Sequence, residues 1–522
     1  MRAIDYFDKG AEAFPDRVAI IDRATQYTYR QMREASHKIA RAMWARGLRG
    51  EGRAAIFSAN DARILLCMVG IMRAGGVWVP INFRNALDAN VQFLNYSSTS
   101  WLFYHSAFRE QVREMKAQVP SLQHFVCLDA DIDGDTSLDS FMQQGLEGEE
   151  IEWGDAHGNL ERFVGLVPTG GTTGPAKGVM VTSLSWGTMV ETANLCLRCE
   201  DVLPVCLSTA PLSHAAGVVA FAMFPLGATN VVMPGFDALE VLQNIERYRV
   251  THIFLPPTAL YMMLEHPQAS EFDYSSLRRM LLAAAPVSPD KLKKAVEVFG
   301  PCVCQSYGQT EAPMYLTYLD TKTVAAAAAG DHPERLRSCG KATPAVRLAI
   351  MDDHGKLLPT HQTGEIVARG PLVSGGYYNL PEATAEIRAF GWHHTGDVGY
   401  RDEDGFFYIV DRKKDMIITG GFNVYCAEVE ACVMELPQVR ECAVIGVPDE
   451  KWGEAVKAIV VLRDQEAAGK DAIIAHCKVR LGSVKVPKSV EFWREIPKTP
   501  AGKTDKKAIR KPYWAKADRA VH

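Results

Sequence analysis

The sequence lacks the long apolar runs that mark membrane-spanning or exported proteins. None of its 522 residues belongs to a run of about 18 uninterrupted apolar residues, the length that a transmembrane helix needs. The first residues, MRAIDYFDKGAEAFPDR, carry charges where a secretory signal would have an apolar segment. We therefore expect no integral membrane segment and a cytoplasmic location.

A strong excess of charge of one sign is also missing. Lys and Arg number 57 against 62 Asp and Glu, so the formal net charge is −5, and the basic residues are spread along the chain. Residues 503–511 form a modest basic cluster, which is most simply a solvated helix face. The composition therefore predicts no nucleic-acid partner.

Cysteine spacing typical of a metal site is absent, although the chain has 12 cysteines. Cys196 and Cys199 form a C-x-x-C pair, but the neighbouring cysteines do not complete a zinc-ribbon spacing. Others, such as Cys67 in ILLCMVGIM, lie within apolar runs. The pattern indicates reduced thiols that pack in hydrophobic cores.

The chain does have the length and apolar content for several cores. With 47% hydrophobic residues over 522 positions, more than one domain is expected. Before residue 346, strand-like runs such as HIFLPP and MLLAAAP alternate with helical patterns such as residues 183–197, which predicts an α/β fold with largely parallel sheets. Residues 125–155 are acidic and contain glycine, and we interpret them as a surface excursion.

From residue 346 onward the pattern changes to short strands. GEIVARG and GWHHTGDVGYRDEDGFFYIVDR alternate with period two around turn residues, which indicates a mainly β subdomain. Within it, Asp397 follows Thr395 and Gly396 and is expected in a turn. Five consecutive charges at residues 411–415 then precede a compact α+β segment, and they are either a solvated turn or a domain junction.

A glycine-rich stretch, TGGTTGPAKGVM at residues 169–180, is typical of an anion-binding loop. Its glycines let backbone N–H groups approach an anion, its threonines offer hydroxyl groups, and Lys177 offers a positive charge. Because Gly178 follows Lys177, the stretch does not match the Walker pattern G-x-x-x-x-G-K-[ST]. Taken alone, it is either a phosphate-binding loop between two strands or a flexible surface linker.

Two shorter motifs suit the same chemistry. In YGQTE, Tyr307 offers an aromatic face to a nucleobase, Thr310 a hydroxyl to a phosphate, and Glu311 an oxygen ligand to Mg²⁺; an ordinary polar turn is the alternative. In PLSHAAG, His214 stands at the end of a predicted strand, where it either lines a pocket or serves as a core or helix-cap histidine.

Taken in order, TGGTTGPAKG, PLSHAAG, YGQTE, GEIVARG, HTGDVG, DRKKDMIITGGFNV and PKTPAGK resemble the motifs of the acyl-adenylate-forming (AMP-binding) superfamily, and in particular its acyl- and aryl-CoA synthetases. The resemblance implies an α/β fold with two domains. Residues 1–413 would form a large N-terminal domain of two αβ sheets plus a β subdomain, and residues 414–522 a small mobile α+β domain. The implied cofactors are ATP, Mg²⁺ and coenzyme A.

The resemblance also assigns roles to residues of this chain. The phosphate-binding group would comprise Thr169, Gly170, Gly171, Thr172, Thr173, Gly174 and Lys177. The nucleotide-binding group would comprise Ala284, Ala285, Pro286, Tyr307, Gly308, Asp397 and Arg412. Thr310 would contact the α-phosphate, Glu311 would hold Mg²⁺, and His214 would border the carboxylate of the substrate. Lys414 would be the hinge, and Gly420 and Gly421 would line the pantetheine path.

The implied reaction joins a carboxylate to ATP, giving acyl-AMP and pyrophosphate, and then passes the acyl group to coenzyme A. Ala283 and Ala284 stand where relatives often have glycine, and their methyl groups would narrow the acyl pocket. In similar enzymes that activate amino acids, an aspartate near the position of Ser213 binds the ammonium group; Leu212, Ser213 and His214 offer none, so an α-amino acid is disfavoured. We expect an aryl or medium-length aliphatic acid.

Two other functions stay open at this point. The first is an adenylating ligase that passes the acyl group to a carrier-protein thiol or to an amine. The second is a nucleotide-binding protein without catalysis, which the joint presence of Lys177, Glu311, Asp397 and Lys503 disfavours. A homodimer and an acyl-carrier partner are also left open.

Lys503, in PKTPAGK, would bridge the carboxylate and the α-phosphate while acyl-AMP forms. We predict that Lys503→Ala slows acyl-AMP formation about 10²- to 10³-fold, because a charge placed where negative charge accumulates is worth roughly 3 to 4 kcal/mol. Thiolation of supplied acyl-AMP should be less affected. The two half-reactions, measured separately, check this prediction, and an equal loss in both would contradict it.

Overall fold

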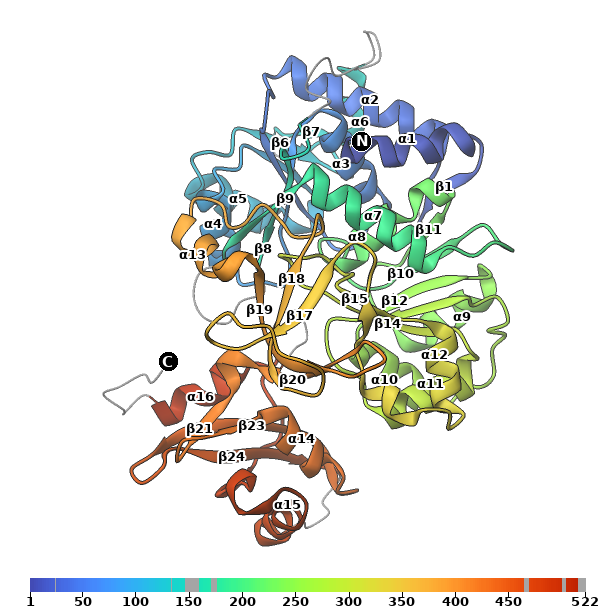
Figure 1. Cartoon of the computed structure of the whole chain (residues 1–522). Helices are drawn as coiled ribbons and strands as arrows, with labels where there is room; N and C mark the ends of the chain where they lie inside the picture. Colours follow the sequence, from blue (N-terminus) through green and yellow to red (C-terminus); the bar gives the residue numbers. More distant parts are fainter. Residues whose placement is uncertain are drawn as a thin grey trace. The chain divides into compact units, whose positions relative to one another are not determined.

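A computed structural model describes residues 1–23, 25–132, 134–145, 159–169, 176–463, 469–499 and 504–514. The chain divides into two compact units (Figure 1). The first unit holds the described residues up to Leu348 together with Ala368–Arg388, and the second holds Ala349–Val367 and the described residues from Ala389 onward. Across the described ranges, no helix is long and apolar enough to cross a bilayer.

The first sheet of the first unit has the order β7-β6-β5-β3-β4-β8-β9. Its strands pair in parallel except β8 with β9, which are antiparallel. The strands are β3 (Arg53–Phe57), β4 (Val77–Pro80), β5 (Trp101–Tyr104), β6 (His124–Cys127), β7 (Thr136–Ser137), β8 (Phe163–Pro168) and β9 (Gly178–Thr182).

The second sheet of the first unit has the order β16-β15-β14-β13-β12-β10-β11-β1-β2. Its centre, from β14 to β1, is parallel, and its two ends are antiparallel. The strands are β1 (Val18–Ile21), β2 (Gln26–Thr28), β10 (Val205–Ser208), β11 (Thr229–Val232), β12 (His252–Leu255), β13 (Arg279–Leu282), β14 (Val303–Tyr307), β15 (Thr317–Leu319) and β16 (Gly340–Ala342).

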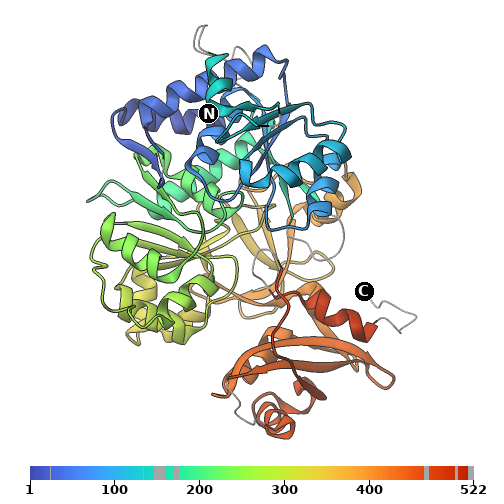
Figure 2. The same cartoon turned by 180° about the vertical axis from the view of Figure 1, so that it is seen from behind.

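Helices cover both sheets of the first unit. α4 and α5 bury apolar residues against the first sheet, whereas α7 packs on β8 and β9 and also against α8, which packs on β10 of the second sheet. Figures 1 and 2 show α9 to α12 gathered together beside the second sheet. The helices are α1 (Ala3–Ala13), α2 (Tyr29–Ala45), α3 (Ala62–Arg73), α4 (Leu87–Tyr96), α5 (Arg109–Gln118), α6 (Leu138–Gln143), α7 (Ser183–Leu197), α8 (Ala215–Ala222), α9 (Ala238–Arg247), α10 (Pro257–Glu265), α11 (Pro289–Phe299), α12 (Thr321–Ala328) and α13 (Pro381–Glu386).

The second unit begins with four strands that neighbour one another in chain order, which confirms the predicted β subdomain. They are β17 (Arg347–Met351), β18 (Gly364–Arg369), β19 (His393–Arg401) and β20 (Phe406–Arg412). A sheet of order β22-β21-β24-β23 follows, with β25 beside β24. Its elements are β21 (Ile417–Thr419), β22 (Phe422–Val424), β23 (Val439–Asp449), β24 (Gly453–Leu462), β25 (Ser489–Phe492), α14 (Cys426–Met434), α15 (Lys470–Lys485) and α16 (Lys506–Trp514).

Alternation along β23 and β24 gives this small sheet two buried faces. Val444 and Val460 belong to the core that contains residues of α14 and α15, whereas Ile445 and Ile459 pack with Ile509 of α16. The expected domain boundary between residues 413 and 414 falls within the second unit, and it stays a prediction.

One expectation about the fold is wrong. Residues 125–155 were expected to form an excursion on the surface, but their described part supplies β7 and most of β6 to the first sheet, and it also forms helix α6. Phe141 of α6 is fully buried against the rings of Trp101 and Phe103. The acidic and glycine residues dominate the composition of this stretch, whereas a few apolar side chains determine its packing.

Eight of the 12 cysteines are buried, as the sequence predicts, whereas Cys196, Cys199, Cys339 and Cys442 are half-buried. All 12 are free thiols, and burial raises the pKa of Cys206, Cys302 and Cys304 to about 12. One cluster among the described residues brings metal-binding atoms close together, Cys432, Glu435 and His476, and the C-x-x-C pair is not part of it.

Candidate active site

The ends of the glycine-rich stretch are held together at the edge of the first sheet. The backbone N–H of Thr169 donates to the carbonyl of Lys177 at 2.9 Å, and the N–H of Lys177 donates to the hydroxyl of Thr169 at 3.2 Å. The predicted position between two strands is confirmed, since β8 precedes the stretch and β9 follows it. Gly170, Gly171, Thr172, Thr173 and Gly174 lie outside the described residues.

Residues 374–378, here called the bridging segment, connect β9 to the YGQTE motif. Gly376 accepts from the N–H of Met180 and Gly375 donates to its carbonyl, both at 2.8 Å. At the other end, the N–H of Ser374 donates to the carbonyl of Glu311 at 2.8 Å. The segment therefore places the glycine-rich stretch next to Glu311, although about 130 residues separate them along the chain.

Tyr377 of the bridging segment brings Lys177 and Glu311 together. Its hydroxyl donates to Oε1 of Glu311 at 2.6 Å, and Nζ of Lys177 lies 4.8 Å from the centre of its ring. Burial and the neighbouring Glu311 carboxylate raise the pKa of Tyr377 well above its usual range, so the phenol stays protonated and donates. In the first unit a cation and a carboxylate thus contact the same tyrosine, the cation at its ring and the carboxylate at its hydroxyl.

Sequence reasoning missed Tyr377. The run GYYNLPE offers only a strand-like pattern, and the hydrogen bond to Glu311 spans 66 residues. A contact between such distant residues leaves no local signal in a single sequence.

The predicted nucleotide-binding residues of the first unit follow adjacent parallel strands. Tyr307 ends β14, and residues 284–286 follow β13, so both groups lie at the carboxyl edge of the second sheet, where ligands bind in such folds. Ala284 has a φ of +77°, a left-handed conformation that costs a non-glycine residue about 1 to 2 kcal/mol. Backbone strain of this kind often concentrates at functional sites.

The two residues predicted to bind the ribose lie in the second unit. Asp397 of β19 and Arg412 of β20 stand opposite each other, and Nε of Arg412 lies 2.6 Å from Oδ1 of Asp397. Asp397 was expected in a turn, and this is wrong, because it is a residue of β19. The turn signal came from Gly396, whose φ is +68°, but the strand continues through this position and a bulge follows between Val398 and Gly399.

Gly420 and Gly421 form the turn between β21 and β22, also in the second unit. Their φ angles are +57° and +81°, and a Cβ atom on Gly420 would lie 2.6 Å from the ring of Trp452. Glycine is therefore required at this hairpin tip. Lys414 lies on the short helical turn Lys413–Asp415, and Lys503 lies outside the described residues.

His214 occupies the N-cap position of α8, directly after the segment that leaves β10. Its side chain is exposed, and its Nδ1 lies 3.0 Å from the hydroxyl of Ser213. The predicted start of a small-residue helix at His214 is confirmed, whereas β10 ends at Ser208, six residues before His214.

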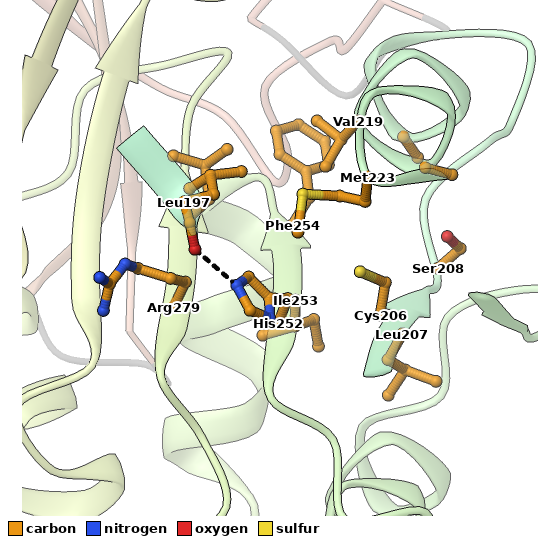
Figure 3. Close-up of a pocket in the computed structure, with 13 residues that line it drawn as sticks. Leu197, Cys206, Leu207, Ser208, Val219, Met223, His252, Ile253, Phe254 and Arg279 are labelled. Carbon is orange, nitrogen blue, oxygen red and sulfur yellow. Dashed lines mark hydrogen bonds between the residues drawn. The ribbon is translucent and has the colours of Figure 1, made fainter. Parts of the chain in front are cut away.

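The helix that His214 caps also covers a small cavity (Figure 3). The cavity measures about 20 Å³, the space of about one water molecule, and lies between α8 and strands β10, β12 and β13. Its lining comprises Leu197, Cys206, Leu207, Ser208, Ala216, Val219, Ala220, Met223, His252, Ile253, Phe254, Arg279 and Leu281. Neither Ala283 nor Ala284 lines this cavity, so the narrowing of the acyl pocket by their methyl groups stays a prediction.

The polar residues at this cavity leave it largely uncharged. Nε2 of His252 lies 2.8 Å from the carbonyl oxygen of Leu197. Burial lowers the pKa of His252 to about 4, so its ring is neutral at pH 7. The Arg279 guanidinium points away from Val219 and Met223 in Figure 3. The cavity therefore suits an apolar group.

The donor chemistry of these residues fits the implied cofactors. Glu311 offers the hard oxygen that Mg²⁺ prefers, and Lys177 a charge for phosphate oxygens. The buried carboxylate of Asp397 can accept hydrogen bonds from a diol. The expectation that Gly420 and Gly421 line the path of the coenzyme A arm stays a prediction.

Comparison with known proteins identifies the family. Residues 7–378 match the pattern of the AMP-binding enzymes, and residues 428–503 match the AMP-binding enzyme C-terminal domain. The chain belongs to the family of AMP-binding enzymes. The resemblance seen in the sequence is thus confirmed.

Two curated relatives are acid–CoA ligases. A feruloyl-CoA synthase from Amycolatopsis sp is 35% identical over 511 residues, which cover 96% of this chain and 97% of the relative. A medium/long-chain-fatty-acid–CoA ligase from Mycobacterium tuberculosis is 45% identical over 369 residues, which cover 69% of this chain. The chain spans 63% of the length of the second relative.

A solved structure of an amide bond synthetase from Marinactinospora thermotolerans confirms the expected α/β class. It is 30% identical, has a TM-score of 0.87, and the match covers 98% of this chain and 100% of that one. Family membership and relatives agree with the predicted enzyme class, an AMP-forming acid–thiol ligase.

We predict that Tyr377→Phe raises the Mg²⁺ concentration needed for half-maximal acyl-AMP formation about 10-fold or more. The change removes the hydrogen bond that orients Glu311 but keeps the ring beside Lys177, and partners of metal ligands typically contribute 10- to 100-fold to metal affinity. Pyrophosphate exchange over a Mg²⁺ titration measures the effect.

Tyr378→Phe is the matched control for this variant. Its hydroxyl contacts Arg53 at 2.9 Å, not Glu311, so its Mg²⁺ dependence should stay within twofold of the parent enzyme. Equal shifts in both variants would contradict a specific role for Tyr377.

Proposed function

We propose that this chain activates an apolar carboxylic acid, either aryl or medium-length aliphatic, as acyl-AMP and transfers the acyl group to coenzyme A. The observation that carries the proposal is the convergence of Lys177, Tyr377 and Glu311 in the first unit. A nucleotide-binding protein without catalysis would not need a lysine and an oriented carboxylate at one place.

In the first half-reaction, an oxygen of the carboxylate attacks the α-phosphorus of ATP, and pyrophosphate leaves. Thr169 and Lys177 would hold the phosphates that depart, while Glu311 would hold the Mg²⁺ that neutralises them. Thr310 would contact the α-phosphate, and Tyr307 would stack on adenine. Such positioning and charge neutralisation supply most of the rate acceleration in phosphoryl chemistry.

The second half-reaction forms a thioester and releases AMP. The thiol of coenzyme A would reach the acyl carbon along the path that begins at Gly420 and Gly421. A rotation of the C-terminal domain at Lys414 would switch the enzyme from the first half-reaction to the second. The two acid–CoA ligases among the relatives support coenzyme A as the acceptor. The amide bond synthetase supports an amine as the second candidate.

The cavity under α8 supports an apolar acid. His214 occupies the N-cap position of α8, the helix whose inner face lines the cavity, so an acid with its carboxylate near His214 could direct its tail along α8. Because the cavity holds about one water molecule, any acyl tail that enters it would need Met223 or Phe254 to move. The choice of aryl and medium-length acids over long-chain acids rests on the methyl groups of Ala283 and Ala284.

Acid-dependent ATP–pyrophosphate exchange tests the proposed activity. Aryl, short, medium and long-chain acids are compared without coenzyme A, and we expect exchange with the aryl or medium acids. Thioester should then form only when coenzyme A is added. Exchange with an amide product from added amine would favour the second candidate, and no exchange with any acid would contradict adenylation.

We predict that Met223→Ala moves the preferred aliphatic acid to longer chains by about two or three carbons, because it removes the three outer heavy atoms of a side chain that fills the cavity. The ratio of kcat/KM values across a series of acids measures the shift. Met263→Ala is the control, because Met263 is equally buried but does not line the cavity. An unchanged preference in Met223→Ala would place the acyl tail elsewhere.

A further inference from the structure

The side chain of Asn60 forms hydrogen bonds with the segment that leads to His214. Asn60 follows a strand of the first sheet, whereas this segment follows a strand of the second sheet. Asn60 lies between β3 and α3, and the segment it contacts follows β10. Its side-chain amide donates to the carbonyl of Ala210 at 2.9 Å, and its side-chain oxygen accepts from the N–H of Leu212 at 2.8 Å. Both polar atoms of one side chain thus hold backbone about 150 residues away.

Leu212 is confined from the opposite side by α8. A Cβ atom on Gly217 would lie 2.0 Å from the carbonyl oxygen of Leu212, so only glycine permits this approach. The side chain of Leu212 is 1% exposed. Its backbone is therefore fixed between Asn60 and α8, two residues before His214.

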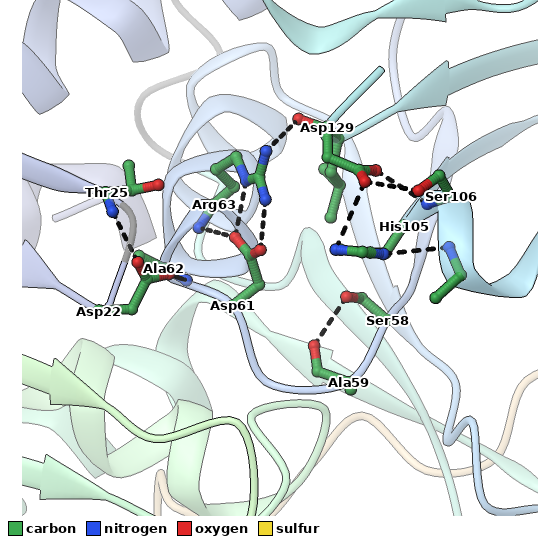
Figure 4. A network of polar contacts seen from close by, with 12 residues as sticks. Asp22, Thr25, Ser58, Ala59, Asp61, Ala62, Arg63, His105, Ser106 and Asp129 are labelled. Carbon is green, nitrogen blue, oxygen red and sulfur yellow. Dashed lines mark hydrogen bonds and ion pairs between the residues drawn. The ribbon is translucent and has the colours of Figure 1, made fainter. Parts of the chain in front are cut away.

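A polar network follows Asn60 directly in the chain and fixes the backbone at the start of α3 (Figure 4). The Asp61 carboxylate accepts from Nε and Nη2 of Arg63 at 2.8 and 2.6 Å. The Asp22 carboxylate accepts from the N–H of Ala62 at 2.9 Å. This network has no place in the proposed reaction, but a side chain that orients another segment needs a rigid base.

We infer that Asn60 is a positioning residue for His214. Its two hydrogen bonds set the course of residues 210–214 and thereby place His214 at the carboxylate end of the acyl pocket. The connection to the acid rests on the proposed function, whereas the restraint of Leu212 rests on the hydrogen bonds alone. Asn60 acts through Leu212 and does not touch the substrate.

Asn194 provides a matched control. It is also half-buried, and its side-chain amide donates to two carbonyls, those of Val190 and Ala222. Ala222 is the last residue of α8, whereas His214 precedes its first. Asn194→Ala therefore removes comparable hydrogen bonds at the end of α8 that is remote from His214.

Hydrogen exchange of the whole protein tests the restraint independently of any activity. In Asn60→Ala the amide of Leu212 should exchange about tenfold faster, because it loses its acceptor. Asn60→Asp keeps an acceptor and should retain most of the protection, and Asn194→Ala should leave the Leu212 amide unchanged. Unchanged exchange in Asn60→Ala, or equal acceleration in Asn194→Ala, would overturn the inference.

Steady-state kinetics test the connection to the acid. Asn60→Ala should raise the KM for the acid about tenfold and change the KM for ATP less than twofold, whereas Asn194→Ala should change neither beyond twofold. In a His214→Ala background, Asn60→Ala should have no further effect, since it acts through His214. Independent, multiplying effects of the two substitutions would overturn the inference.

If the wild-type protein showed no acid-dependent ATP–pyrophosphate exchange, the result would contradict the proposed function and not the inference about Asn60. The hydrogen-exchange comparison would still decide whether Asn60 restrains Leu212. The two failures are therefore distinguishable.

Discussion

The first unit depends on the main-chain hydrogen bonds of the bridging segment, residues 374–378. These bonds pair the segment with β9, which would otherwise be an open edge of the first sheet, and then with the carbonyl of Glu311. Backbone geometry thus sets the separation between Lys177 and Glu311, two groups that must act on one polyphosphate. Tyr377 then orients the carboxylate without having to create the proximity.

Local patterns predicted the elements that local forces determine. The helical pattern expected over residues 183–197 is observed as α7, whose first turn Thr182 caps, and the strand-like runs HIFLPP and MLLAAAP supply β12 and β13. Composition failed at α6, where buried Phe141 outweighs many polar neighbours. At Asp397, pairing with β20 overrode a glycine turn signal, since strand pairing is a tertiary effect.

The residues of the candidate site divide in the same way, into those that sequence motifs predict and those that only the folded structure reveals. Motifs with fixed order predicted Lys177, Tyr307, Glu311, Asp397 and Arg412, and the structure brings Lys177 near Glu311 and Asp397 opposite Arg412. Tyr377 and Asn60 left no such signal, because each acts on a residue that is distant in the sequence and belongs to no motif of its own. Supporting residues of this kind become visible only when the sheets are assembled, and the expected cytoplasmic location stays a prediction.

Burial of the thiols affects how the protein's own cysteines react with acyl-AMP. An acyl-AMP is a reactive mixed anhydride that acylates any accessible thiolate. Because burial raises the pKa of Cys206, which lines the cavity, and of Cys302 and Cys304, these groups stay protonated at neutral pH. A protein that makes such an anhydride is thereby spared from capturing its own product at these cysteines, and the acyl group is left for a thiol that enters from outside.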